Sequence, residues 1–498
     1  MHFDLIIAGG TVADGTGAPG YPADVGVKGD RIVAVGDLHD ATARDTIDAT
    51  ALVVAPGFID PHNHANNEAE GGILSIPRAE NQVRQGVTTL IAGNCGGCNW
   101  PVAEHLAAVE QCDIRQNYAT LLGMGTLRAQ VVQDSGRPAN TDELAQMQRL
   151  VDQGMEEGAI GMSTGYFPAH VTTDEIAELT TAVARNGGVY SSHVRNEGDG
   201  LLGSIEEIIQ IGVRAELPVQ VSHIKTYGRR NWFKIDAVLA TMEAGQRRGV
   251  DVKADRYPYV ACFTGLASVL PMWARTEAIT RGQLKSADDE AWNARVRRAV
   301  ADQFDLIGGP QNVMFAPLVP DPRLDGKRLS QYAEELGQDP IDVAIDLIQA
   351  AAVSCIYFTM SEDNIETFYR HPLVMGGSDG HLREFGKGVS HPRNYGTMPR
   401  IIGHYGRDRG LFAVEEAVRK CTSMAAERWG LKGRGVLAEG HFADIVVFSW
   451  EDITDRATFE DQHRYPEGIP WVIVNGGIAV ANGATTDGCY GRVIRQGQ

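Results

Sequence analysis

TTDEIAELTTAVARNGGVYSSHVRNEGDGLLGSIEEIIQIGVRAELPVQVSH, residues 172–223, contains the same structural pattern twice. The first copy begins with a helical stretch whose opening residues, Thr172 and Glu175, form a capping-box pair. The helical stretch ends at the glycine pair that starts at Gly187, and Val189–Ser192 then forms a short strand candidate. The segment therefore predicts a helix followed by a short buried strand.

The second copy repeats this order, and each copy ends on a histidine. Apolar residues recur at helical spacing from 201 to 212, and Val219–Ser222 is the next strand candidate. His193 follows the first strand directly, and His223 follows the second, thirty residues later. The segment predicts repeated helix–strand units that present a histidine at the end of each strand.

The same alternation continues on both sides of this segment. Eight strand candidates alternate with helical patterns, which predicts an α/β chain. The expected fold is a (β/α)8 TIM-like barrel whose site lies at the carboxyl ends of the strands. The eight strand candidates are Val53–Asp60, Thr88–Ala92, Tyr118–Leu122, Ala159–Met162, Val189–Ser192, Val219–Ser222, Asp251–Ala254 and Leu373–Gly376.

Both ends of the chain have a different pattern. Short β-branched runs separated by turn residues occupy the first 36 residues, and Ala443–Ser449 and Trp471–Val474 continue the pattern near the other end, with an Asn-Gly turn after them. We therefore predict a small β-sandwich built from residues 1–56 and 431–498, around a barrel of residues 57–430. The long connection before the last strand predicts an insertion at about 265–370 that covers or shapes the site.

Composition limits the function classes. The formal net charge of −19 argues against a nucleic-acid partner, because phosphate binding needs a basic surface. Seven cysteines in 498 residues do not form a disulfide framework and favour a reducing compartment. We see no signal peptide and no apolar run long enough to span a membrane, so we expect a cytoplasmic protein without a membrane partner. The oligomeric state is left open, with a homo-oligomer among the alternatives.

Metal-binding residue types follow five of the predicted strands. His62 and His64 are two residues apart after the first strand, so both point to one side of an extended backbone. Cys95 follows the second strand and can supply a thiolate, and Asp379 follows the eighth. Together with His193 and His223, these residues predict a zinc site at one end of the barrel.

Each of these residues also has a simpler interpretation. A single buried histidine is more often a core residue than a ligand, Cys95 alone would be a small buried hydrophobe, and Asp379 alone would be a turn residue. The metal interpretation rests on their joint occurrence at five strand ends.

Two further motifs are weaker. Cys95 and Cys98 form a C-x-x-C pair without a second copy. Gly161–Gly165 matches the G-x-S-x-G serine-hydrolase elbow around Ser163, but Pro168 follows too soon for the helix that this motif needs.

Ten stretches of the chain resemble the amidohydrolase superfamily and, within it, the N-acyl-D-amino-acid deacylase (D-aminoacylase) family. The resemblance covers nearly the whole chain and implies a barrel with a small β-sandwich from both chain ends. The stretches are GGTVADGTGAPGYPADVGVKGDRIVAVG, APGFIDPHNH, QGVTTLIAGNCG, GAIGMSTGYF, GGVYSSHVRNEG, LPVQVSHIK, ADRYPYVA, GGSDG, HPRNYGTMPRIIGHY and GVLAEGHFADIVVF.

The resemblance also implies the roles of the metal-binding residues. Cys95, His193 and His223 would hold one tightly bound zinc, and His62, His64 and Asp379 would form a second, weaker position. Relatives outside the family bridge two metals with a carboxylated lysine after the fourth strand, but residues 159–166 contain no lysine. The resemblance therefore implies that Cys95 bridges instead.

A catalytic role and a substrate contact follow from the same resemblance. Asp379 would act as general base and then general acid, taking a proton from water that zinc activates and returning it to the leaving amine. Lys225, Tyr257 and Arg393 would grip the α-carboxylate of the substrate.

Two stretches depart from the family pattern. Ala65-Asn66-Asn67 replaces the acidic residues that usually follow the first His-x-His pair, and Cys262-Phe263 occupies a stretch where relatives have a serine. We therefore expect zinc-dependent hydrolysis of a linear amide, with an N-acyl-D-amino acid as the leading small-molecule substrate. The alternatives are an amidohydrolase acting on another amide, such as a cyclic imide, an amide drug or a xenobiotic, a non-catalytic binding barrel, and a serine hydrolase.

Overall fold

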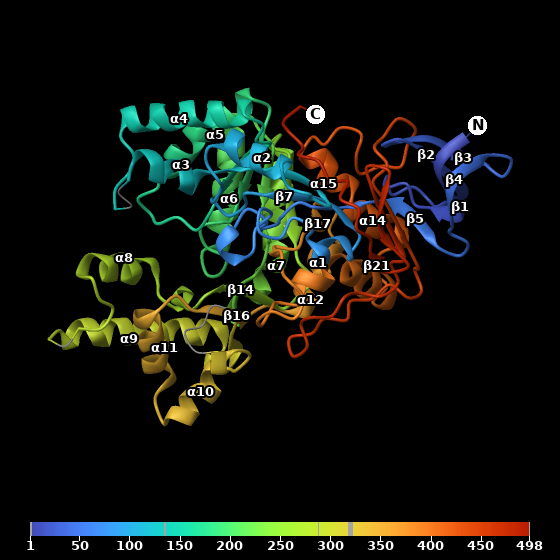
Figure 1. The fold of residues 1–498 in the computed structure, drawn as a ribbon. Coiled ribbons are helices and arrows are strands. Elements are labelled where there is room, and N and C mark those ends of the chain that lie inside the picture. The colour runs from blue at the N-terminus through green and yellow to red at the C-terminus, as the bar shows by residue number, and fades with distance from the viewer. Residues whose placement is uncertain (1, 134–135, 287, 317–321, 498) are drawn as a thin grey trace.

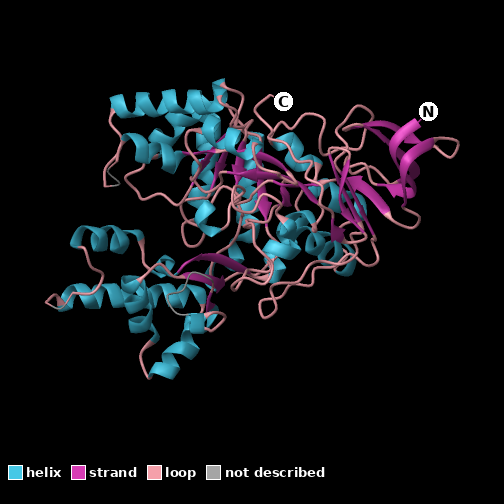
Figure 2. Ribbon diagram, viewed as in Figure 1, coloured by secondary structure: helices cyan, strands magenta, loops and turns pink. Residues whose placement is uncertain are grey.

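The computed structural model describes residues 2–133, 136–286, 288–316 and 322–497, and it has a mixed α/β fold. A barrel of strands and surrounding helices occupies the centre, and a sheet with strands from the N-terminal and C-terminal parts of the chain lies beside it (Figure 1). A largely helical insertion, drawn in yellow, projects from the opposite side of the barrel (Figures 1 and 2). None of the helices in the described ranges is long and apolar enough to cross a membrane.

The eight predicted barrel strands are all present, and the barrel strands pair in parallel. Six observed strands form one sheet, in the order β17-β13-β12-β11-β10-β9, and three form a second, β6-β7-β8. The predicted strand Tyr118–Leu122 is divided between the two sheets at Leu121, between β8 and β9. The two sheets also meet between the first and last strands, where the Asp379 amide donates to the His62 carbonyl at 2.8 Å and the His64 amide donates to the Gly380 carbonyl at 2.8 Å. These contacts close the barrel. Its strands are β6 (Phe58–Asp60), β7 (Val87–Ala92), β8 (Asn117–Thr120), β9 (Leu122–Gly123), β10 (Gly161–Thr164), β11 (Val189–Ser192), β12 (Val219–Val221), β13 (Val252–Arg256) and β17 (Val374–Gly376).

Helices follow the barrel strands and pack their apolar faces on the barrel. The helix predicted from Thr172 is α5 (Thr173–Arg185), and the Thr172 side chain accepts from the Glu175 amide at 3.1 Å. The capping box itself is incomplete, because the Glu175 carboxylate pairs with Arg128 at 2.9 Å instead of turning back to Thr172. The other helices around the barrel are α1 (Glu80–Val83), α2 (Val102–Glu110), α3 (Met124–Val131), α4 (Thr141–Glu156), α6 (Leu201–Ala215), α7 (Ile235–Arg247), α12 (Glu362–Arg370), α13 (Arg393–Pro399), α14 (Val414–Cys421) and α15 (Ser423–Arg428).

The first predicted strand, Val53–Asp60, is divided between two sheets. Residues Val53–Pro56 form β5, which pairs with β1 and β18, whereas Phe58–Asp60 form β6 of the barrel. The chain changes sheet at Gly57, where a Cβ atom would lie 2.3 Å from the Thr88 side chain. The pattern of apolar residues is continuous across this point, so it does not reveal the break.

Strands from both chain ends share one nine-stranded sheet. Its order is β21-β20-β19-β18-β5-β1-β2-β3, with β4 also pairing with β1. The predicted Asn475-Gly476 turn connects β19 to β20, and both residues have positive φ angles, 45° and 81°, as a tight hairpin turn needs. The strands are β1 (His2–Val12), β2 (Tyr21–Lys28), β3 (Arg31–Gly36), β4 (Thr42–Asp48), β5 (Val53–Pro56), β18 (Ile445–Phe448), β19 (Trp471–Val474), β20 (Gly477–Ala481) and β21 (Ala484–Thr485).

The insertion leaves the barrel after β13 and has an apolar core of its own. Its antiparallel sheet, in the order β14-β16-β15, packs with four helices around a buried cluster that includes Trp292, Phe304 and Phe315. The strand β14 brings Cys262 and Phe263 to the wall of the barrel opening. The elements are β14 (Ala261–Gly265), α8 (Met272–Arg281), α9 (Glu290–Ile307), β15 (Val313–Phe315), α10 (Leu329–Leu336), α11 (Pro340–Ala350) and β16 (Ser354–Phe358).

Candidate metal centre and active site

A cavity of about 630 Å³ opens at the carboxyl ends of the barrel strands, between the barrel and the insertion. Seven of the nine residues singled out in the sequence line it, while His62 and Tyr257 lie buried behind its wall. The seven are His64, Cys95, His193, His223, Lys225, Asp379 and Arg393.

Cys95 lies at the centre of a cluster of imidazoles. Its Sγ atom is 3.4 Å from Nε2 of His223 and 3.5 Å from Nε2 of His62. The His193 side chain also bonds to Cys95, and the His193 and His223 rings are 4.5 Å apart between centroids. Residues that follow four different strands thus direct nitrogen and sulfur atoms to one point.

Asp379 joins this cluster from the last strand. Its Oδ1 atom is 2.9 Å from Nε2 of His64 and 3.4 Å from Nε2 of His62. Donor atoms of His62, Cys95, His223 and Asp379 all lie within 4.8 Å of one another, close enough to surround a single cation. Zinc prefers nitrogen and sulfur donors in a small tetrahedral site, so this donor set fits zinc.

Three of the cluster residues have positive φ angles, a left-handed backbone conformation that is unfavourable for residues other than glycine. The φ angles are 54° at Cys95, 36° at His223 and 49° at Asp379. A left-handed conformation costs a non-glycine residue about 1–2 kcal/mol. Strain of this kind collects at functional sites, where the surrounding structure holds it in place.

The electrostatics of the cluster favour a thiolate and a carboxylate. Burial opposes ionisation of the Cys95 thiol, but His223 and His62 outweigh it and hold the pKa of Cys95 well below its usual value. Burial likewise opposes ionisation of Asp379, but the Arg393 guanidinium and the His223 ring hold the pKa of this carboxyl well below its usual value. The cluster therefore offers two anionic donors to a cation.

Glu197 is a site residue that sequence reasoning missed. Its carboxylate lies 3.1 Å from Nδ1 of His223 and 3.8 Å from Nε2 of His193, and it pairs with the Lys225 ammonium. His193, Glu197 and His223 form a second group whose donor atoms lie within 4.8 Å of one another. The signal in the sequence is its position four residues after His193, in the loop that carries that histidine.

Of the three residues expected to bind a carboxylate, Lys225 and Arg393 line the cavity, and Tyr257 lies buried behind its wall. Arg393 Nη1 donates to Asp379 Oδ2 at 2.6 Å, and its Nε has no hydrogen-bond partner. The Tyr257 ring lies between cations, 5.1 Å from the Arg393 guanidinium and 5.7 Å from the Lys225 ammonium. Arg393 and Lys225 are thus already paired with carboxylates of the protein, and each retains N–H groups for a ligand.

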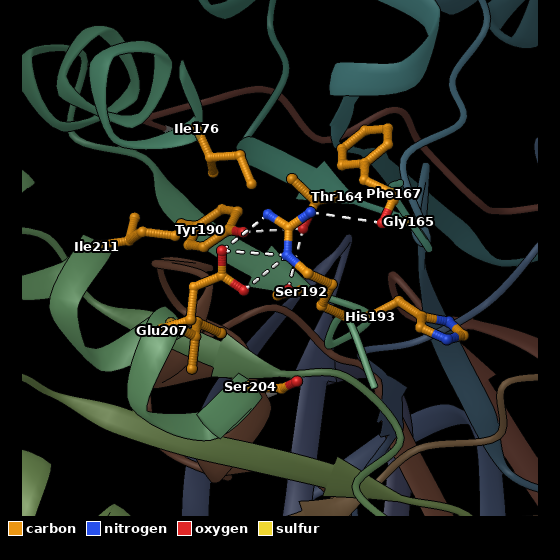
Figure 3. Close-up of a pocket in the computed structure, with 12 residues that line it drawn as sticks. Thr164, Gly165, Phe167, Ile176, Tyr190, Ser192, His193, Ser204, Glu207 and Ile211 are labelled. Atoms are coloured by element: carbon orange, nitrogen blue, oxygen red, sulfur yellow. Dashed lines mark hydrogen bonds and ion pairs between the residues drawn. The ribbon is translucent and has the colours of Figure 1, made fainter. Parts of the chain in front are cut away.

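A half-buried ion pair supports the wall beside His193. Arg195 pairs with Glu207 at 2.8 Å and donates to the Pro168 carbonyl at 3.2 Å, in the loop that carries Tyr166. Figure 3 shows His193 at the edge of this cluster, with its ring turned away from Glu207. The ion pair holds the β10–α5 loop in place next to the cavity.

The two weaker sequence motifs do not form reactive sites. Ser163 is fully buried on β10 and donates to the Gly93 carbonyl at 2.5 Å, so its hydroxyl does not face the cavity. Burial raises the pKa of the Cys98 thiol, and both Cys95 and Cys98 are free cysteines. The geometry argues against a serine nucleophile and against a disulfide at the C-x-x-C pair.

Comparison with known proteins identifies relatives over nearly the whole chain. A model described as the Amidohydrolase family matches residues 45–480. D-aminoacylase from Alcaligenes xylosoxydans xylosoxydans is 37% identical over 518 aligned residues, which cover 99% of this chain and 97% of the relative.

Solved structures agree over the whole chain. A D-aminoacylase structure concerned with a binuclear metal centre matches with a TM-score of 0.85 at 36% identity, covering 99% of this chain and 100% of the other. N-acyl-D-glutamate deacylase from Bordetella bronchiseptica, solved with zinc and a phosphonate inhibitor, matches with a TM-score of 0.86 at 31% identity and the same coverage.

Proposed function

The chain belongs to the amidohydrolase family, and we propose that it is a zinc-dependent deacylase that hydrolyses N-acyl-D-amino acids. The observation that carries the proposal is the convergence of Cys95, His223, His62 and Asp379 at the base of a cavity wide enough for a small substrate. The names of the relatives support the substrate class.

The proposed metal site has a strong and a weak half. Cys95, His193 and His223 would hold the tightly bound zinc, since they combine a thiolate with two imidazoles. His62, His64 and Asp379 would hold a second ion more weakly, with Cys95 shared between the two positions. When bound, zinc supplies a Lewis acid and lowers the pKa of water from 15.7 to about 7.

Asp379 would carry out the proton transfer in the reaction. Asp379 is ionised, so its carboxylate can take the proton of the attacking water. The hydrogen bond from Arg393 Nη1 leaves Oδ1, the oxygen that faces His62 and His64, as the proton acceptor. Asp379 would then return the proton to the leaving amine, which regenerates its carboxylate, and the Arg393 guanidinium would stabilise that carboxylate.

The α-carboxylate of the substrate would bind beside this group. Arg393 would offer its free Nε, and the Lys225 ammonium and the Tyr257 hydroxyl would complete the contact. Cys262 does not replace the serine hydroxyl of relatives as a carboxylate contact, because burial raises the pKa of its thiol to about 11 and a neutral thiol is a weak donor. Phe263 lines the cavity there and would narrow it.

The sheet shared by the two chain ends supports a structural inference as well. A separate apolar cluster lies within it, formed by residues such as Ile7, Val25, Val447 and Ile473. We infer that this part is the small β-sandwich, with residues 57–430 as the catalytic barrel.

The test is a chiral substrate panel with zinc-loaded enzyme. We expect release of D-amino acids from N-acetyl-D-amino acids, with the L-isomers cleaved much more slowly. Asp379→Asn should lower kcat by about 10²–10⁴-fold, because it removes the proton acceptor, while zinc content stays at or above half of the wild-type value. Asp40→Asn, an exposed position with the same chemical change, is the control.

Three results would contradict the proposal. Undiminished kcat in Asp379→Asn would remove Asp379 from the reaction. Cleavage of cyclic imides or other amides without a free α-carboxylate, in preference to every N-acyl amino acid, would favour the alternative amidohydrolase, and no turnover of any amide would favour a binding barrel.

A further inference from the structure

The carboxylates that line the cavity are matched by cations of the protein. Glu197 pairs with Lys225, and Asp379 pairs with Arg393. Asp199, at the rim, pairs with Arg230. Each of these carboxylates therefore has a positive partner before any substrate binds.

Arg275 breaks this balance. It lies on α8 of the insertion and lines the cavity, yet no aspartate or glutamate of the described residues lies within ion-pair distance of its guanidinium. Its Nε donates to the Leu270 carbonyl at 2.9 Å, which uses one of its five N–H groups. Within the described part of the cavity wall, Arg275 is the one lysine or arginine without a carboxylate partner.

The surroundings of Arg275 are aromatic and partly dry. Its guanidinium carbon lies 5.8 Å from the centre of the Tyr166 ring. Burial lowers the pKa of Arg275, and the titratable groups that oppose this shift are tyrosines, Tyr166, Tyr357 and Tyr227, and not aspartates or glutamates. A guanidinium stays charged in such a site, and an anion bound there would offset the part of its desolvation that the Leu270 carbonyl and the Tyr166 ring leave uncompensated.

The position of Arg275 relative to the metal centre suits a substrate group. Tyr166 lies near both, since its ring centroid is 6.3 Å from that of His193 and 5.8 Å from the Arg275 guanidinium carbon, and all three residues line the same cavity. A ligand whose amide lies at the metal centre would reach Arg275 with the far end of a side chain or of an acyl chain. Guanidinium binds carboxylates through two parallel hydrogen bonds, which makes a carboxylate the expected ligand.

We propose that Arg275 binds a second carboxylate of the substrate, so that the enzyme prefers N-acyl-D-amino acids that carry an anionic group in addition to the α-carboxylate. The inference rests on the proposed function and narrows its substrate class. The second carboxylate has two possible sources, an acidic side chain or a dicarboxylic acyl group.

Matched substrate pairs test the preference in the zinc-loaded full-length enzyme. N-acetyl-D-glutamate against N-acetyl-D-glutamine tests the side chain, and N-succinyl-D-leucine against N-acetyl-D-leucine tests the acyl group. We expect kcat/KM to be about 10- to 100-fold higher for the dicarboxylic member of one pair, the range for a charged hydrogen bond. The pair that shows the difference identifies the source.

Variants of Arg275 assign the preference to this residue. Arg275→Met and Arg275→Gln should abolish it through a raised KM for the dicarboxylic substrate, while turnover of the neutral partner stays within about twofold and shows that the fold is intact. Arg275→Lys should keep part of the preference, because an ammonium retains the charge but not the paired geometry. Arg281→Met, at the exposed end of the same helix, is the matched control.

Three outcomes overturn the inference. Equal kcat/KM within both pairs in the wild type would show that no second carboxylate is recognised. An equal loss for neutral and dicarboxylic substrates in all Arg275 variants would make the residue structural. Both leave the proposed deacylase function standing, whereas no turnover of any of the four substrates would remove the proposed function and this inference together.

Discussion

At the scale of single residues, Asp255 connects His62 and His223, two of the proposed zinc ligands. Its Oδ1 atom lies 3.0 Å from Nδ1 of His62 and accepts from the His223 backbone amide at 2.7 Å. Its Oδ2 atom accepts from Gln220 at 2.8 Å. With Nδ1 of His62 donating to Asp255, Nε2 of that ring is left as the lone-pair donor facing Cys95 and Asp379.

We expect Asp255→Asn to weaken zinc binding by about 10- to 100-fold, because the His62 tautomer and the His223 backbone are no longer held. Competition with a zinc chelator of known affinity measures the change. Asp236→Asn, an exposed position on α7, should leave the affinity unchanged. Wild-type zinc affinity in Asp255→Asn would show that the contact does not orient the ligand.

Sequence patterns locate the residues that face the cation better than those behind them. Cys95, His223 and Asp379 could be predicted, because each follows a strand of a parallel barrel and such ends converge. Asp255 and Glu197 could not, because a carboxylate near a strand end has no distinctive spacing and its partner depends on how the next strand packs. Arg275 could not be predicted as a cavity residue either, because it lies on a helix of the insertion and not at a strand end.

At the scale of elements, only half of the capping box predicted for α5 forms, because a tertiary contact competes for the other half. Thr172 caps the helix as its sequence predicts, but the Glu175 carboxylate is drawn to Arg128 and to the Ala139 amide at 3.0 Å. The strand break at Gly57 has a similar origin. A continuous apolar run fits both sheets, and only the packing of Gly57 against Thr88 decides where one strand ends.

We expect Thr172→Ala to lower the local stability of the first turn of α5 by about 1 kcal/mol, because it removes the acceptor for the Glu175 amide. Hydrogen exchange of the first-turn amides measures this directly. Thr181→Ala, the same substitution in the body of α5, should not accelerate exchange there. Unchanged protection in Thr172→Ala would mean that tertiary contacts alone hold the turn.

At the scale of the whole molecule, the three parts have separate tasks. The barrel brings strand ends together, the insertion supplies the outer wall with Phe263 and Arg275, and the end sheet joins strands from the N-terminal and C-terminal parts of the chain. The barrel could be predicted because its strand–helix alternation repeats eight times. The internal architecture of the insertion could not, since its antiparallel strands are short and β14 pairs with residues of β16 that lie 89 to 97 positions later in the chain.

The most direct test of the account is X-ray absorption at the zinc edge of the loaded enzyme. We expect one sulfur scatterer at about 2.3 Å together with nitrogen scatterers at about 2.0–2.1 Å. The sulfur signal should vanish in Cys95→Ser and persist in Cys98→Ser. A shell of nitrogen and oxygen alone, or a sulfur signal that survives Cys95→Ser, would contradict the account.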